Sequence, residues 1–135
     1  MIDIEITNEQ RHVAIDRRRL RALVERIAAD AGYRQGTIGV AVVDDQRIAE
    51  LHGRYLNDPT PTDTMSWVLE RREDYLEGEV IASGETAARR AAEFNQTPDD
   101  ELALYVIHGT LHLVGHDDGR PEEAAQMRAL ERRYL

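Results

Sequence analysis

Apolar and polar residues alternate in the opening segment MIDIEI, where Ile2, Ile4 and Ile6 fall on one face. This two-residue period predicts an edge or half-buried strand. The β-branched, apolar run at 37–45 is typical of a buried strand. Two further strands are predicted at 64–70 and 79–83, with a polar loop over 70–78.

A helical period separates these runs. Apolar residues at helical spacing follow residue types that favour helix starts, and Gly32 ends the first helix. The predicted helix starts, in chain order, are Asp16, Asp45, Ser83, Thr97 and Pro121. Strands therefore alternate with helices before helices follow in a run. The pattern predicts one α/β (α+β) domain over residues 1–135, with a four-stranded mixed sheet packed with about five helices.

The fourth predicted helix is apolar nearly all round from Leu102 to Val114, so it should be buried. His108 and His112 interrupt it four residues apart. Side chains at this spacing lie on the same face one turn apart, so both imidazoles can bind one ion. Burying two histidines is costly unless they are paired or bind a metal. The sequence thus predicts a metal site at the end of a buried helix.

A catalytic zinc site needs a third protein ligand and an open position. Gly115 allows the chain to leave the helix in a left-handed conformation. The residues just beyond it are His116, Asp117 and Asp118. The third ligand is therefore expected from this turn, with Asp118 favoured and His116 as the alternative.

The protease motif H-E-x-x-H carries its general base directly after the first histidine. Gly109 occupies that position here, which disfavours a metallopeptidase. The absence of cysteine excludes thiolate ligands and disulfides. The net charge of −9 disfavours non-specific coating of nucleic acid. The chain shows neither a signal peptide nor a membrane-spanning run, which predicts a cytoplasmic protein.

The segment HGTLHLVGHDD (108–118) resembles the signature H-G-x-L-H-L-x-G-[YH]-D-H of the YbeY family of bacterial metal-dependent endoribonucleases. It differs only at the last position, where Asp118 replaces histidine. The segments LHGRYLNDPTPTDTMSWV (51–68) and EGEVIAS (77–83) are also similar to that family. The resemblance covers about the whole chain.

The resemblance implies a small α/β domain that is a Zn²⁺-dependent, single-strand-specific endoribonuclease. Its implied role is ribosomal RNA processing, including the 3′ end of the small-subunit RNA, and ribosome quality control. The implied partners are single-stranded RNA and the small ribosomal subunit with its proteins. Zinc held by His108, His112 and Asp118 would activate a water for attack on a phosphodiester.

Other departures from the family pattern concern the RNA-facing side of the site. The family arginine after the tyrosine falls on Leu56, and Arg54 can replace it only if the helix end turns it inward. The family asparagine after Leu51 is His52, which is interpreted as a surface helix residue. Two other hypotheses remain: a non-catalytic, metal-binding ribosome-associated protein, and a metallohydrolase acting on another substrate.

Overall fold

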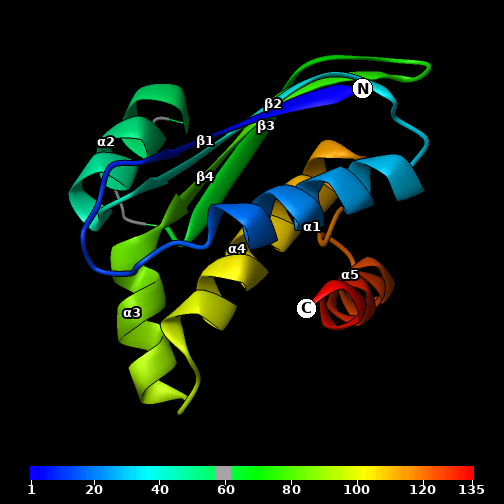
Figure 1. Cartoon of the computed structure of the whole chain (residues 1–135). Coiled ribbons are helices and arrows are strands. Elements are labelled where there is room, and N and C mark those ends of the chain that lie inside the picture. Colours follow the sequence, from blue (N-terminus) through cyan, green and yellow to red (C-terminus); the bar gives the residue numbers. More distant parts are fainter. Residues whose placement is uncertain (57–61) are drawn as a thin grey trace.

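In the computed structural model the described residues fold into one four-stranded sheet and five helices (Figure 1). The model describes residues 1–56 and 62–135. The strand order is β1-β2-β4-β3, with β3 antiparallel to β4 and the other neighbours parallel. The mixed sheet and the α/β class are therefore confirmed. In chain order the elements are β1 (Ile2–Asn8), α1 (Arg17–Asp30), β2 (Gln35–Val43), α2 (Asp45–Leu56), β3 (Thr64–Arg72), β4 (Tyr75–Ser83), α3 (Gly84–Glu93), α4 (Pro98–Leu113) and α5 (Pro121–Tyr134).

The main core lies between one face of the sheet and helices α1 and α4. Alternate residues of the strands supply it, among them Ile4, Val40 and Val80. The opposite face of the sheet is covered at one end by α2, where Ile48 packs on Ile81 and its neighbours. A smaller cluster joins α1 and α4 to α5. Helix α4 thus lies at the centre, which explains why its sequence is apolar all round.

The region predicted as a polar loop at 70–78 is instead the end of a β-hairpin, so that prediction is wrong. β3 continues to Arg72 and β4 begins at Tyr75. Leu76 is fully buried while its neighbours face outward, so the alternation is present but short. The Arg72 guanidinium lies 4.1 Å from the Tyr75 ring centroid, and β2 pairs alongside this part of β4. Pairing with the neighbouring strand outweighs the polar composition.

The start of α2 also differs from the sequence prediction. Asp44, not Asp45, caps the helix, because its carboxylate accepts a 2.8 Å hydrogen bond from the Arg47 backbone N–H. The Asp45 carboxylate points to α3 instead, where it accepts hydrogen bonds from Ser83 Oγ, Thr86 Oγ1 and Arg89. Asp45 therefore ties the start of α2 to the start of α3.

This contact gives a stability prediction. Burial acts to raise the pKa of Asp45, but the hydrogen bonds from Ser83, Thr86 and Arg89 outweigh it and hold the pKa below its usual value. A carboxylate with a depressed folded-state pKa stabilises the fold above its unfolded pKa, and this stability is lost as the pH falls through the folded value. We expect Asp45→Asn to lower the free energy of unfolding by about 1–3 kcal/mol at neutral pH, measured by urea denaturation.

The difference between wild type and Asp45→Asn should shrink as the pH is lowered through the acid range. Asp44→Asn is the matched control, because asparagine still caps a helix and its effect should be small. An Asp45→Asn variant as stable as wild type at neutral pH would show that this network contributes nothing.

Candidate metal site

Helix α4 positions the two histidines. Its N-terminus is fixed by Thr97, whose hydroxyl accepts a 3.2 Å hydrogen bond from the Asp100 backbone N–H. Gly109 faces the sheet, and an added Cβ there would lie 2.7 Å from Val80 Cγ1. The packing that buries this side of α4 turns His108 and His112 outward, and their side chains are 28% and 31% exposed. The helix is thus a rigid base for two imidazoles at the surface.

The turn after α4 brings the third group back. Gly115 has a φ of 108°, and the His116 N–H donates to the Leu111 carbonyl at 3.0 Å. This left-handed ending reverses the chain. The Asp117 carboxylate then accepts a 2.8 Å hydrogen bond from the Asp118 N–H, so Asp117 stabilises the turn. Asp118 is placed over the two histidines as a result.

The three side chains form a compact group of metal-binding atoms. His108 Nε2 and His112 Nε2 are 3.2 Å apart, and Asp118 Oδ2 lies 3.6 Å from His108 Nε2. Asp118 Oδ1 lies 3.8 Å from His112 Nε2. Ligands 2.0–2.1 Å from a tetrahedral zinc ion are separated by roughly 3.3 Å, so small movements would complete such a site. The donor set, two neutral nitrogens and one carboxylate, fits a divalent cation.

His116, the alternative third ligand, lies elsewhere. It lines a cavity with residues of α1 and α5, including Asp30 and Tyr134. It does not belong to the group formed by His108, His112 and Asp118. The geometry of the described residues therefore favours Asp118, as the spacing after Gly115 predicts.

Glu131 was not predicted from the sequence. It comes from α5, its side chain is 14% exposed, and its Oε1 lies 3.4 Å from His108 Nδ1. A carboxylate that accepts a hydrogen bond from the Nδ1–H of a histidine fixes the tautomer in which Nε2 is free to bind a metal. Its only sequence signal is its place one helical turn after Met127 in an amphipathic helix, and this does not distinguish it from neighbouring acids.

We expect Glu131→Ala to weaken zinc affinity about 10- to 100-fold, because His108 would lose the group that orients its ring. A competition titration against a chromogenic chelator measures this directly. Glu123→Ala removes a half-exposed acid of the same helix, which pairs with Arg120, and should leave the affinity unchanged. Equal affinities for Glu131→Ala and wild type would contradict an orienting role.

A cavity of about 390 Å³ opens beside the histidines. Its walls come from α2, the start of β3 and α4. The lining residues are His52, Thr62, Asp63, Thr64, Met65, Ser66, His108 and His112. His52, interpreted as a surface residue, thus faces the site. The polar side chains in its wall suit a polar substrate group next to the metal-binding atoms.

The structure gives less support to Arg54, the residue predicted to supply a cation to the site. Arg54 is exposed in the last turn of α2 and is not among the described residues lining this cavity. Its role therefore stays a prediction. The side chain of Leu56, at the family arginine position, lies outside what the structure describes.

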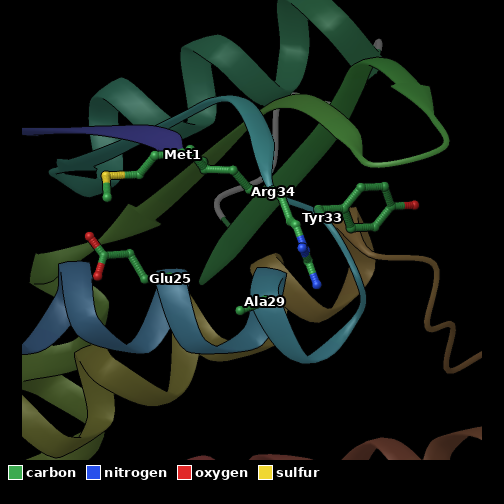
Figure 2. A pocket seen from close by; sticks show the side chains of 6 residues that line it. Met1, Glu25, Ala29, Tyr33 and Arg34 are labelled. Atoms are coloured by element: carbon green, nitrogen blue, oxygen red, sulfur yellow. The ribbon is translucent and has the colours of Figure 1, made fainter.

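A second cavity, of about 360 Å³, lies between α1 and the first residues of the chain (Figure 2). Glu25 and Ala29 come from α1, Met1 precedes β1, and Tyr33 and Arg34 precede β2. It shares no lining residue with the histidine cavity. Its one carboxylate cannot provide a metal site, so the candidate chemistry stays with α4.

The part of the chain that the structure describes contains no helix with the length and apolar character needed to cross a membrane.

Comparison with known proteins identifies relatives along the whole chain. The family model for Endoribonuclease YbeY matches residues 5–135. The Endoribonuclease YbeY of Syntrophus aciditrophicus is 37% identical, over 95% of this chain and 84% of the relative. That of Carboxydothermus hydrogenoformans is 34% identical, over 97% and 94%.

The Endoribonuclease YbeY of Rhodopirellula baltica is 44% identical over 106 residues. That alignment covers 77% of this chain but 55% of the relative, so the chain spans about half the length of that protein. The solution structure of a Thermotoga maritima protein is also similar, with a TM-score of 0.68 and 27% identity. It matches 97% of this chain and 85% of the solved chain, so the fold is shared almost throughout.

Proposed function

The chain belongs to the YbeY family, and from this premise we propose that it is a zinc-dependent endoribonuclease that cuts single-stranded RNA. The observation that carries the proposal is the convergence of His108, His112 and Asp118, because the two histidines also line the cavity beside this group. Three protein ligands leave a fourth position open, which distinguishes a catalytic zinc site from a structural one. Endoribonuclease is also the activity named for the relatives.

The chain's own residues would prepare the site for hydrolysis of a phosphodiester. A bound zinc ion would supply a Lewis acid that polarises a phosphoryl oxygen and lowers the pKa of the attacking water. Glu131 fixes the His108 tautomer that binds a metal through Nε2. Asp117 stabilises the turn that places Asp118 beside the histidines. Ser66 lines the cavity, and its hydroxyl can donate a hydrogen bond to a phosphate oxygen.

We further propose a cytoplasmic role in ribosomal RNA processing, including maturation of the 3′ end of the small-subunit RNA, and in ribosome quality control. The partners would be the small ribosomal subunit and its proteins. Family membership supports this part of the proposal.

The test is an assay of the zinc-loaded chain on one RNA sequence, presented single-stranded and as a duplex. We expect endonucleolytic cleavage of the single strand and little of the duplex. Peptide turnover without RNA cleavage would support the metallohydrolase alternative. Zinc binding without any turnover would support a non-catalytic binding protein.

A further inference from the structure

The histidine cavity continues toward α3 through two smaller cavities. The next cavity, of about 160 Å³, shares Asp63, Thr64 and His108 with it. A third, of about 250 Å³, shares Asp63 and Arg90 with the second. Shared walls make them neighbours, and α3 packs against α4 (Figure 1). These neighbouring cavities, together called the groove, extend from the two histidines to the arginines of α3.

Two consecutive arginines lie at the far end of this groove, and they differ in availability. Arg89 donates hydrogen bonds to Asp45 at 3.0 Å and to Thr86 Oγ1 at 3.2 Å. Its charge is therefore already paired with a carboxylate in the contact between α2 and α3. Arg90 lines both of the smaller cavities, and its side chain is 50% exposed. Its ion pair with Asp63 is long, at 3.5 Å. Arg90 is thus the better placed of the two to receive a new anion.

We propose that Arg90 binds a backbone phosphate of the RNA adjacent to the phosphodiester at the metal site. This inference rests on the proposed function and names a subsite of it. A guanidinium matches a phosphate with two parallel hydrogen bonds. Thr62 and Thr86 line the same cavity, but their hydroxyls already donate to the Thr64 carbonyl and to Asp45, so Arg90 is the donor that a phosphate there would use. Arg90 would supply a cation to the site, because the position of the family arginine is Leu56 in this chain.

The overall charge makes such a local cation important. A chain with a net charge of −9 repels RNA at long range, so binding depends on a few cations near the site. The Asp63 carboxylate lies in the groove and opposes a phosphate. Its pair with Arg90 is exposed enough to contribute little stability, so a phosphate can take the guanidinium from it. Asp63 would then weaken RNA binding and Arg90 would strengthen it.

The test compares RNA cleavage kinetics of Arg90→Ala, Arg90→Lys and Asp63→Asn over a series of salt concentrations. For Arg90→Ala we expect KM to rise about 10-fold with little change in kcat. The plot of log kcat/KM against log salt should become less steep by about 0.7, the value for one phosphate contact on a single strand. Arg90→Lys should restore the slope but only part of the KM, because lysine lacks the planar fork.

Asp63→Asn separates a phosphate contact from a structural ion pair. Under the proposal it lowers KM or leaves it unchanged, opposite to Arg90→Ala; an increase as large as that of Arg90→Ala would overturn the inference. Arg18→Ala removes an exposed charge of α1 away from these cavities and should change neither KM nor slope. Circular dichroism checks that each variant is folded.

The remaining outcomes distinguish the subsite from the function itself. If wild type cleaves RNA and Arg90→Ala matches it in KM and slope, the subsite is wrong and the nuclease function stands. If the same loss occurs in Arg54→Ala and not in Arg90→Ala, the cation is Arg54. If metal-loaded wild type fails to cleave RNA, the proposed function is wrong and the subsite with it.

Discussion

His112→Ala should abolish RNA cleavage, with a loss of about a thousand-fold or more, while leaving the fold intact. The loss follows from removing one of two imidazoles on α4, without which a divalent ion is held by His108 and Asp118 alone. A catalytic metal contributes several kcal/mol to transition-state stabilisation, so its loss has a large effect. The fold should survive because the side chain is 31% exposed and does not belong to the buried core. Cleavage rate and bound metal per chain, by elemental mass spectrometry, are the measurements.

His12→Ala is the matched control, since it removes an imidazole that is 45% exposed and lies outside the metal group. It should keep both metal and activity. A His112→Ala variant that still cleaves RNA at the wild-type rate would show that the activity does not depend on this site.

The third ligand is tested in the same experiment with two more variants. Asp118→Ala should lose most of the bound zinc, because its carboxylate oxygens lie 3.6 Å and 3.8 Å from the two imidazole nitrogens. His116→Ala should retain it, because His116 lines a cavity with α1 and α5 residues. Loss of metal on His116→Ala alone would mean that the turn rearranges around the ion and that the assignment is wrong.

The sequence predicted the elements whose signal is local. The strand β1 follows from strict alternation, and α4 follows from an apolar run with Thr97 and Pro98 at its start. The pair His108 and His112 follows from helical spacing alone. The turn at Gly115 follows because few residues other than glycine accept its φ of 108°.

Features that depend on contacts across the chain were not predicted. The hairpin end at 70–78 looks like a loop because the pairing of β3 with β4, and of β4 with β2, is what makes those polar residues strands. Glu131 is 23 residues from His108, and no local pattern indicates that they meet. Arg90 reaches the groove only because α3 packs on α4. The shell around the histidines is thus a tertiary feature, whereas the histidines themselves are a local one.

The position between the histidines illustrates how packing and chemistry are linked in α4. We expect Gly109→Ala to lower the free energy of unfolding by about 1 kcal/mol, although alanine is the better helix former. The new Cβ would lie 2.7 Å from Val80 Cγ1 and 3.4 Å from Thr64 Oγ1. Overpacking of this kind costs about 1–3 kcal/mol, because a valine side chain cannot turn away easily. Gly109→Glu should cost more than about 3 kcal/mol, because it also buries a carboxylate.

Urea denaturation followed by circular dichroism measures both variants. Gly119→Ala makes the same chemical change where nothing lies within 4 Å of the added Cβ, so its effect should be within about 0.5 kcal/mol of zero. A Gly109→Ala variant more stable than wild type would show that α4 can move off the sheet. If it cannot, the general-base glutamate of the zinc proteases has no room at this position. The close contact of α4 with β4 then keeps a peptidase glutamate out of this position, which argues against a peptide as the substrate of the metallohydrolase alternative.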